Sequence, residues 1–477
     1  MILSYKYKLK PKQSQQQTML HWIAMLRSHY NYCLRDRIES YEEVTAPRLG
    51  NYSDLKRKGE CCPLTCSISK NSSLGEPFKS SGKRRSTYEM QSAELPFLKK
   101  ARPWYGTIHS TVLQQNLRKL DMAFKNFFKH GRGYPKFKTS QRFKSFSYPP
   151  NHIKLNGNKI YLPSIGWMGF FQSRKIPDGF TNRSVTIRQK ADGWYVSLQI
   201  EDKSVPQSQP LALDKVKTVL GIDLGLKKLL SLSNSETIAN PQFEKQLEGT
   251  KTIRQRRASR KKKGSKNQKK AYQKLARIDQ KIVNQRENYQ WKIAHKLVRI
   301  AEVLVFEDLN LKGMIRRCKA KQDELGRFLK NGQCAKKALN RLIRDCSWGN
   351  LKQKVQSVAE KFGCHYVEVS PKFTSQQCSH CGHTQKENRH KERFLCLNCG
   401  FLADADIQAS INIGEKGTQI LGLSQNKLLG VTQKVTGKSE STDSTNSREK
   451  SVPLGVEPTN PRQLSLFEWM NGEAILC

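Results

Sequence analysis

Residues 219–225 read VLGIDLG, an apolar, strand-like run that contains one acid, Asp223. Residues 303–309 read VLVFEDL and hold Glu307 in the same way, and the apolar segment 402–413, a predicted helix, holds Asp406. An isolated buried carboxylate is costly unless it is paired or binds a metal. The three acids together therefore predict a site for two divalent ions ~4 Å apart, which would activate a water and stabilise the leaving oxygen in phosphodiester cleavage.

The order of elements around these acids indicates the fold. Strands at 218–223 and 228–232 come first, and a long helix leads to the Glu307 strand. A helix at about 336–362, a strand at 365–369 and the Asp406 helix follow. This order predicts a ribonuclease-H-like (RuvC) α/β domain within a multidomain α+β chain. Asp404 lies about 200° around the predicted helix from Asp406, so only one of the two acids can face the site.

Two cysteine knuckles precede that helix. Residues 378–382 read CSHCG and residues 396–400 read CLNCG, with 14 residues between the two Cys-x-x-Cys pairs. Four thiolates at this spacing predict a zinc ribbon, and each glycine permits the tight turn of its knuckle. Because all four positions of the ion are filled by protein, this single zinc is expected to be structural. The predicted ligands are Cys378, Cys381, Cys396 and Cys399.

The N-terminal half has a different pattern. Residues 3–9 alternate as a strand, and the apolar spacing at 19–34 and 107–130 predicts helices. Asn156-Gly157 and Asp192-Gly193 each separate two alternating runs, which predicts hairpins with type I′ turns. Residues 131–212 are therefore expected to form a small antiparallel β domain that strand 3–9 could join. Residues 44–100 are expected to be an irregular insertion.

The net charge is +45, from 85 Lys plus Arg against 40 Asp plus Glu. This excess predicts a polyanionic partner, nucleic acid first, and disfavours a metabolic enzyme for neutral small molecules. No apolar run is long enough for a membrane span, and no export signal or lipidation motif is apparent, so we expect no membrane partner and a reducing cytosol. Residues 415–477 carry equal numbers of cations and acids and are rich in Ser and Thr, so most of this tail is expected to be disordered.

Two segments are candidates for nucleic-acid contact. Residues 132–138 alternate cations with aromatics, which suits phosphates and bases, although a half-buried strand would read the same way. Residues 254–270 hold ten cations and no acid just before a predicted helix; a solvated linker is the alternative. The candidate contacts are Arg132, Tyr134, Lys136, Phe137, Lys138, Arg254, Arg256, Arg257, Arg260, Lys261, Lys262 and Lys263.

Taken together, the motifs GIDLG (221–225), FEDL (306–309) and TSQ-x-CS-x-CG (374–382), and the run from the second knuckle through 413, resemble the transposon-encoded TnpB (OrfB) family, relatives of the type V CRISPR effectors. The GYPKFK stretch at 133–138 is also similar to theirs. The resemblance covers roughly residues 1–35 and 105–414. It implies an RNA-guided DNA endonuclease in which Asp223, Glu307 and Asp406 form the catalytic triad with Mg²⁺.

The same resemblance implies the domain plan and the partners. A wedge β-barrel would comprise 1–10 and 131–212, and a helical recognition lobe 11–130. The nuclease domain would comprise 213–369 and 401–414, with the zinc ribbon inserted at 370–400. The partners would be a guide RNA from the transposon end and double-stranded target DNA beside a short flanking motif, in the nucleoid of a prokaryotic cytoplasm, with a homodimer as one option.

One position departs from the family pattern. The last motif usually reads Asp-x-Asn-Ala-Ala, whereas residues 406–410 read DIQAS, with Gln408 in place of the Asn. This departure keeps an alternative open, a guided DNA-binding protein with weak or lost cleavage that acts as a repressor or transposition partner. A third interpretation is a transposase that itself joins strands.

Overall fold

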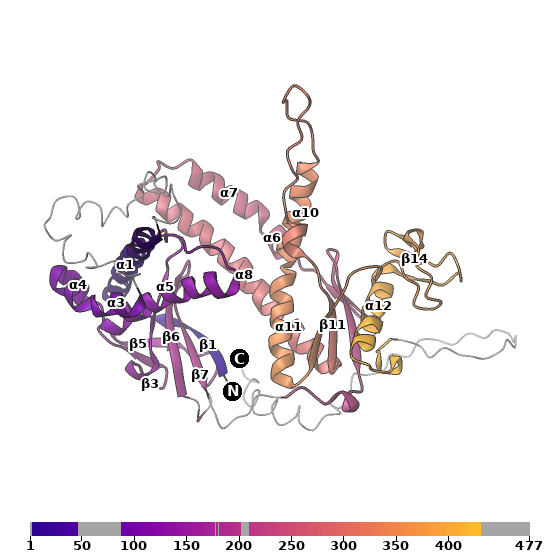
Figure 1. Cartoon of the computed structure of the whole chain (residues 1–477), viewed down its shortest axis with the longest axis horizontal. Coiled ribbons are helices and arrows are strands. Elements are labelled where there is room, and N and C mark those ends of the chain that lie inside the picture. Colours follow the sequence, from indigo (N-terminus) through magenta and orange to yellow (C-terminus); the bar gives the residue numbers. More distant parts are fainter. Residues whose placement is uncertain (1, 46–86, 177, 180, 202–208, 431–477) are drawn as a thin grey trace. The chain divides into compact units, whose positions relative to one another are not determined.

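The computed structural model describes residues 2–45, 87–176, 178–179, 181–201 and 209–430, and the chain divides into two compact units, Met1–Pro206 and Gln207–Cys477 (Figure 1). Each unit is described on its own. No helix in the described ranges combines the length and the apolar character needed to cross a membrane.

The first unit contains a seven-stranded antiparallel sheet in the order β2-β6-β7-β1-β5-β4-β3. As predicted, the N-terminal strand β1 (Ile2–Lys10) joins it, between β5 and β7. The short end strands do not pair with each other in the described residues, so the sheet is a half-barrel in place of the expected closed barrel. The other strands are β2 (Ser145–Tyr148), β3 (Lys154–Asn156), β4 (Lys159–Leu162), β5 (Gly166–Phe171), β6 (Thr181–Lys190) and β7 (Gly193–Glu201).

Helices cover one face of this sheet (Figure 1). Alternate residues of β1, among them Tyr5 and Tyr7, turn inward and share one hydrophobic core with the helices. Trp22 of α1, which is fully buried, meets Phe146 of β2 with ring centroids 5.7 Å apart. The helices are α1 (Gln13–Thr45), α3 (Tyr88–Ala93), α4 (Leu95–Ala101) and α5 (Ser110–His130).

Two expectations for this unit need correction. The end of the supposedly irregular insertion 44–100 is helical, as α3 and α4, and residues 46–86 lie outside the described residues. Both hairpins form, but their turns are not type I′. Asn156 pairs with Lys159 and only Gly157 of the turn has positive φ, whereas a type I′ turn needs positive φ at both central residues. In the second hairpin Lys190 pairs with Gly193, so the pairing register again moves the turn by one residue.

The second unit is built on a five-stranded sheet in the order β10-β9-β8-β11-β12. The three strands β8, β11 and β12 run parallel, and β9 and β10 continue the sheet antiparallel. The buried β11 reads VLVFE, which suits a strand covered on both faces. The strands are β8 (Val219–Leu224), β9 (Lys228–Leu232), β10 (Thr237–Ala239), β11 (Val303–Glu307) and β12 (His365–Val369).

Helices pack against both faces of this sheet (Figure 1). The apolar residues of α8 and α11 form the larger core cluster with the strands, and α12 packs over β8. The helices are α6 (Phe243–Gln246), α7 (Glu248–Ser259), α8 (Lys266–Ile300), α9 (Leu311–Met314), α10 (Gln333–Cys346), α11 (Trp348–Phe362) and α12 (Ala405–Ile420).

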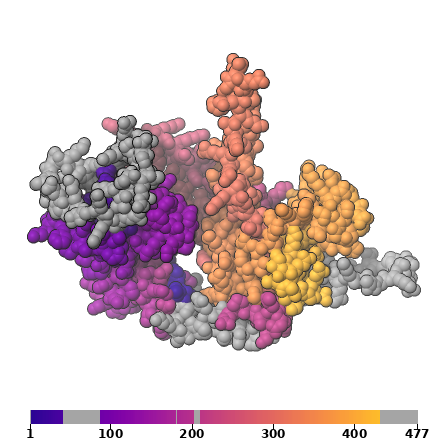
Figure 2. Space-filling model, in the orientation of Figure 1, coloured from indigo at the N-terminus to yellow at the C-terminus, as the bar shows by residue number. Residues whose placement is uncertain are grey.

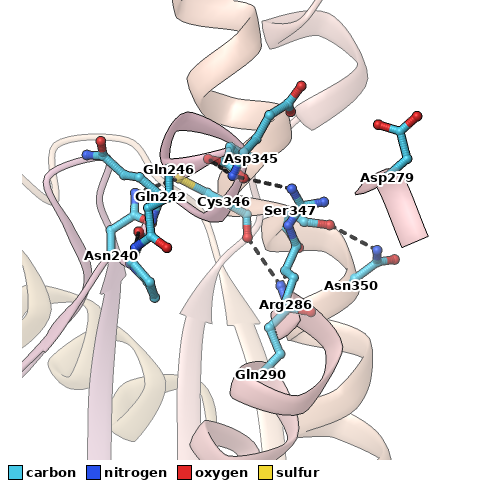
Figure 3. A network of polar contacts seen from close by, with 12 residues as sticks. Asn240, Gln242, Gln246, Asp279, Arg286, Gln290, Asp345, Cys346, Ser347 and Asn350 are labelled. Atoms are coloured by element: carbon cyan, nitrogen blue, oxygen red, sulfur yellow. Dashed lines mark hydrogen bonds and ion pairs between the residues drawn. The ribbon is translucent and has the colours of Figure 1, made fainter. Parts of the chain in front are cut away.

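The helix predicted at 336–362 is in fact two helices that meet at Ser347, whose φ is 54°. A polar network holds this break (Figure 3). Arg286 of α8 donates to the buried Asp345 at 2.7 Å, and Gln290 donates to the carbonyls of Cys346 and Ser347 at 3.2 Å. Because Gln290 of α8 donates to the carbonyls at the end of α10, these carbonyls stay satisfied where the chain turns.

A small three-stranded sheet, β13 (Arg389–His390), β14 (Arg393–Leu395) and β15 (Leu402–Asp404), forms the cysteine-rich insert between β12 and α12. The first part of the segment 415–477, most of which is expected to be disordered, is ordered. Helix α12 continues to Ile420, and the buried Leu428 pairs with Val219 at the start of β8. Residues 431–477 lie outside the described residues.

Candidate metal and nucleic-acid sites

Asp223 and Glu307 end two neighbouring parallel strands. Ile222 of β8 is in register with Phe306 of β11, so one step further along both strands brings the two acids side by side. Side chains in register on adjacent strands point to the same face of a sheet. Glu307 is only 8% exposed, and Asp223 is half-buried.

Glycine lets α12 approach this pair of strands. A Cβ atom on Gly221 would lie 1.9 Å from the carbonyl oxygen of Ser410, so only a residue without a side chain fits there. On the helix side, a Cβ on Gly417 would lie 2.4 Å from Val305. The close contact brings the N-terminus of α12, and with it Asp406, to the end of the sheet where Asp223 lies.

Asp404 does not lie on the helix, contrary to expectation; it is the N-cap. Its carboxylate accepts from the backbone N–H groups of Asp406 at 2.9 Å and Ile407 at 3.2 Å. It also forms an ion pair with Lys228 at 2.9 Å. These contacts use the carboxylate in capping, so Asp406 is the acid of this pair that remains for a site.

The electrostatics of Asp223 show that the three acids are neighbours. Burial, followed by the charges of Glu307 and Asp406, raises the pKa of Asp223 to about 7, while the Arg389 guanidinium lowers it. Burial likewise raises the pKa of Glu307, against the hydrogen bond from Thr374 and the nearby lysines. Neighbouring carboxyl groups whose pKa values are raised in this way are typical of functional sites.

Three residues that the sequence reasoning missed contact these acids. Arg389 of the cysteine-rich insert forms an ion pair with Asp406 at 2.9 Å. Thr374 donates its hydroxyl proton to Glu307 Oε1 at 2.6 Å. Lys352 of α11, only 8% exposed, donates to the backbone carbonyl of Glu307 at 2.8 Å. Thr374 stands in the quoted TSQ motif and could have been found; no pattern marks Arg389.

The only group of His, Cys, Asp or Glu ligand atoms close enough to share one metal, among the residues described, is the cysteine cluster. Asp223, Glu307 and Asp406 do not form such a group. The side chain of Asp406 pairs with Arg389, and like charges repel one another. The three acids are thus close enough to influence one another's charge, but their carboxylate oxygens do not lie close enough together to share one metal ion.

The four cysteines, by contrast, fit a tetrahedral metal. The sulfurs of Cys378, Cys381, Cys396 and Cys399 all lie within 4.8 Å of one another. Cys378 and Cys399 are 3.7 Å apart and Cys381 and Cys396 are 3.5 Å apart, against about 3.8 Å for a tetrahedron with Zn–S bonds of ~2.3 Å. The predicted glycine turns are confirmed, since φ is 77° at Gly382 and 71° at Gly400.

The two thiols of the first knuckle differ in pKa. The backbone N–H of His383 lowers the pKa of Cys381 to about 6, whereas burial raises that of Cys378 to about 12. Figure 2 shows the surface of this insert next to that of α12, both near the yellow end of the colour scale.

Gln408, the residue that departs from the family pattern, points toward the first knuckle. It is fully buried, its Oε1 accepts from Ser379 at 3.0 Å, and its Nε2 donates to the Gln377 carbonyl at 3.1 Å. Its amide is therefore engaged by the insert and away from the carboxylates. The Gln side chain, which is longer than the Asn of the family pattern, therefore leaves the set of Asp223, Glu307 and Asp406 unchanged.

The segment 131–139 carries no regular secondary structure, so the half-buried strand considered for it is wrong. Asn31 holds it through both the N–H and the carbonyl of Lys138, at 2.8 and 3.1 Å. The ring of Tyr134 packs against Phe127, with centroids 5.2 Å apart. The segment is thus anchored while most of its candidate contact residues stay exposed: Arg132, Tyr134, Lys136 and Phe137, with Lys138 half-buried.

The basic run 254–270 covers the end of α7, the turn after it and the start of α8. It is therefore not the solvated linker considered as an alternative. The cations Arg256, Arg257, Arg260, Lys261, Lys262 and Lys263 are exposed, and Arg254 is half-buried. None of them forms an ion pair with the rest of the described chain, so their charge is available to a partner.

Three family models match the chain. The OrfB_IS605 model, described as "Probable transposase", matches residues 198–318. The Cas12f1-like TNB domain matches residues 348–413, which include the cysteine cluster. A model described as a helix-turn-helix domain matches residues 1–45, although the described part of that range forms one strand and one continuous 33-residue helix.

Two curated relatives align with about two thirds of the chain. The chain is 33% identical over 322 residues, covering 67% of this chain and 77% of the relative, to "Putative RNA-guided DNA endonuclease InsQ" of Escherichia coli (strain K12). It is 31% identical over 341 residues, covering 69% of this chain and 77% of the relative, to a "Putative RNA-guided DNA endonuclease" of Streptomyces pristinaespiralis. It is also 27% identical over 236 residues, 46% of this chain and 49% of the relative, to the endodeoxyribonuclease Cas12f1 of Sulfoacidibacillus thermotolerans.

Among solved structures, a Cas12f1-sgRNA-target DNA complex aligns with 87% of this chain and 98% of its own, at 13% identity and a TM-score of 0.45. A CasPhi-2 chain bound to crRNA aligns with 88% and 98%, at 12% identity and a TM-score of 0.34.

Proposed function

This chain belongs to the TnpB (OrfB) family. On that premise we propose that it is an RNA-guided DNA endonuclease. The residues that would carry out cleavage of the DNA phosphodiester bond are Asp223, Glu307 and Asp406. The observation that carries the proposal is the register of β8 and β11, which sets Asp223 beside Glu307, with the Asp406 helix packed onto Gly221. The raised pKa of Asp223 supports it, because like charges gathered at one place favour a bound cation.

We propose that the second unit is a RuvC-like domain. Two features support this assignment. Three parallel strands are extended at one edge by two antiparallel strands, and the acids lie at the ends of adjacent parallel strands and on the last helix. Ligand sites of open α/β sheets lie at the carboxyl ends of the strands, where both acids are found.

Carboxylate oxygens are the ligands that Mg²⁺ prefers, so the three acids would hold two Mg²⁺ ions. When bound, the ions would supply Lewis-acid stabilisation of the attacking and leaving oxygens. The chain itself holds the ligands. Lys352 fixes the backbone at Glu307 and Thr374 fixes its carboxylate, while Arg389 balances the charge of Asp406 and can shift to a DNA phosphate. We assign one structural zinc to the four cysteines.

Base pairing between guide RNA and target DNA would read the sequence, and the protein would hold the heteroduplex and read the flanking motif. The exposed cations of 254–263 and the anchored basic-aromatic segment 132–138 supply sequence-independent contacts to phosphates and bases. Within the described part of the chain, the cations at 254–263 have no ion-pair partners, which supports this role.

The alternative, a guided binder without cleavage, was raised by Gln408. Since the Gln408 amide is taken up by Ser379 and Gln377, it gives no reason to expect a disabled site. The binder is therefore one outcome of the experiment below.

The experiment uses full-length protein purified with its RNA. Sequencing that RNA should yield one discrete species with a variable guide end, and a matched DNA beside a library of flanking sequences should be cut when Mg²⁺ is present. Asp223→Ala should abolish cutting and keep DNA binding. Glu392→Gln, which changes an exposed acid of the insert, is the matched control and should cut normally.

Binding without cutting across the whole library would replace the nuclease by the binder. Random RNA fragments in place of a discrete species would contradict guided recognition and leave plain electrostatic binding.

A further inference from the structure

A buried chain of hydrogen bonds links the cysteine cluster to Glu307. We propose that this relay, which runs through Ser379, Gln408, Gln377, Asn412 and Thr374, makes the affinity of the nuclease centre for divalent metal depend on the zinc ribbon. The proposal rests on the proposed function, because it takes Glu307 as a metal ligand. It makes Thr374, Gln408 and Asn412 positioning residues.

The relay begins at the first knuckle. Gln377 and Ser379 lie on either side of Cys378, and the Gln408 side chain of α12 contacts both of them. Ser379 Oγ donates to Gln408 Oε1 at 3.0 Å, and Gln408 Nε2 donates to the Gln377 carbonyl at 3.1 Å. One fully buried amide therefore clamps the chain on both sides of a zinc ligand.

One turn further along α12, Asn412 continues the relay toward the sheet. Its Nδ2 donates to the carbonyls of Gln377 and Thr374, each at 2.7 Å, which uses both amide protons. Asn412 is 2% exposed, so no water competes for these bonds. Side chains at i and i+4 share one helix face, and here that face holds the whole loop 374–377.

Thr374 is the last link. Its backbone carbonyl is held by Asn412, and its hydroxyl reaches Glu307 Oε1 at 2.6 Å and the Pro371 carbonyl at 3.1 Å. A hydroxyl has one proton to donate, and the shorter contact indicates that Thr374 donates its hydrogen bond to the carboxylate of Glu307. The position of the loop therefore sets the rotamer of a carboxylate that would bind metal.

The relay can transmit the state of the ribbon because, within the described residues, the side-chain amides of Gln408 and Asn412 bond only to other members of the relay. Loss of the ribbon would release Ser379 and the loop, and it would leave the buried amides of Gln408 and Asn412 unsatisfied, which costs more than the bonds themselves. The elements that carry the acids would remain, because β11 and α12 are held by their own cores. Partners that orient metal ligands typically change metal affinity 10–100-fold when they are lost.

The test measures Mn²⁺ binding to the full-length protein by electron paramagnetic resonance. Thr374→Val, which keeps the shape and removes the hydroxyl, should weaken Mn²⁺ binding about tenfold. Thr374→Ser should restore it. Gln408→Met should weaken it as well, although Gln408 touches no acid. Thr418→Val removes a buried hydroxyl of the same helix that bonds only to Glu415, and it should leave Mn²⁺ affinity unchanged.

A second measurement reports on the ribbon without using the acids. Binding coupling is reciprocal, so Thr374→Val and Gln408→Met should each lose zinc to a chromophoric chelator at lower chelator concentration than the wild type and Thr418→Val. Chelation of zinc should weaken Mn²⁺ binding in the wild type and add little in Gln408→Met, where the relay is already broken.

The outcomes separate the two proposals. A wild type that binds no Mn²⁺, or binds it only as well as Asp223→Ala does, overturns both proposals, because the relay needs Glu307 as a metal ligand. The remaining outcomes, in a wild type that binds Mn²⁺ better than Asp223→Ala does, concern the relay alone. Equal zinc retention in all variants overturns the relay. So does a normal Mn²⁺ affinity in Thr374→Val, or a loss in Thr418→Val of the same size.

Discussion

At the scale of single residues, the negative charges of Glu307 and Asp406 destabilise the ionised form of Asp223, and one arginine partly offsets this effect. The pKa of about 7 means that the proton is half removed near neutral pH, which is unusual for an Asp. Arg389, from the cysteine-rich insert, is the cation that offsets the repulsion. The protonation of one side chain in the sheet thus depends on an arginine in another element.

This arrangement predicts a pH dependence for metal binding. Metal binds the ionised carboxylate, so the Mn²⁺ affinity of the purified protein should be level above about pH 7 and fall about tenfold per pH unit below it. The folded metal-free protein holds this proton more tightly than the unfolded chain does. Its stability should therefore rise as the pH falls from about 7 toward the ordinary range of Asp.

Arg389→Met provides the control for this titration. It removes the cation that lowers the pKa of Asp223, so the midpoint should move to higher pH, while Lys227→Met, which changes an exposed lysine paired with Glu392, should leave it in place. A midpoint near pH 4 in the wild type would contradict the prediction.

The acids and the cysteines could be predicted from sequence because each stands out against its neighbours. Asp223 and Glu307 interrupt apolar strands, and the knuckles repeat a pattern. Arg389 and Lys352 could not be predicted, because a cation in a chain with 85 Lys plus Arg carries no local signal. Their roles depend on contacts between elements distant in sequence.

At the scale of elements, glycine sets the distance between α12 and the sheet. A Cβ on Gly221 of β8 would overlap the backbone of α12, and a Cβ on Gly417 of α12 would overlap the Val305 side chain of β11. The missing side chains let α12 approach the sheet, and this approach sets the distance between the start of α12, which carries Asp406, and β8, which carries Asp223.

Gly221→Ala should therefore push α12 away from β8. Overpacking of this kind typically costs about 1–3 kcal/mol, and thermal unfolding followed by circular dichroism should show a lowered Tm. Mn²⁺ binding should weaken with it. Gly249→Ala is the matched control, because a Cβ there meets no atom within 4 Å and the residue lies in helix α7. An unchanged Tm in Gly221→Ala would show that the helix can shift without cost.

Elements were predictable where a local pattern decides them and not where a distant contact does. Alternation identified β1 and both hairpins, since strand faces follow from one residue to the next. The break at Ser347 was not visible, because it depends on Gln290 and Arg286 of α8, which satisfy the groups that the turn exposes. The hairpin turns moved by one residue because pairing along the strands, and not the turn dipeptide, fixed the register.

At the scale of the whole molecule, the charge of +45 is unevenly spread. Residues 415–477 carry seven cations and seven acids, so their sum is zero and the excess belongs to residues 1–414. The run 254–270 supplies ten cations, on a helical hairpin that keeps them fixed. A rigid basic surface presents its charges together, which favours a polyanion over scattered small anions.

Replacing Arg256, Arg257 and Arg260 by Gln should weaken RNA binding with little dependence on sequence. The slope of log K against log salt concentration should fall by about 2–3, since each phosphate contact contributes about 0.7–0.9. Filter binding of the guide RNA across a range of KCl concentrations measures that slope.

A matched triple variant provides the comparison. Lys125, Lys175 and Arg183 each face an acid, Asp121, Asp178 and Glu201, so their replacement by Gln should change the slope less. Equal slopes for both triple variants would mean that net charge alone, and not the α7–α8 surface, governs binding.

The place of α12 in the chain has a consequence for synthesis on the ribosome. Asp406 follows Glu307 by 99 residues, with the whole cysteine-rich insert between them, and Leu428 must still pair with Val219. At about 5–20 residues per second, a nascent chain that already displays Asp223 and Glu307 waits roughly 5–20 s for its third acid. Under the proposed function, the chain would during that interval be basic enough to bind RNA and would lack one of the acids needed for cutting. Assembly with the guide RNA would then precede completion of the proposed nuclease site.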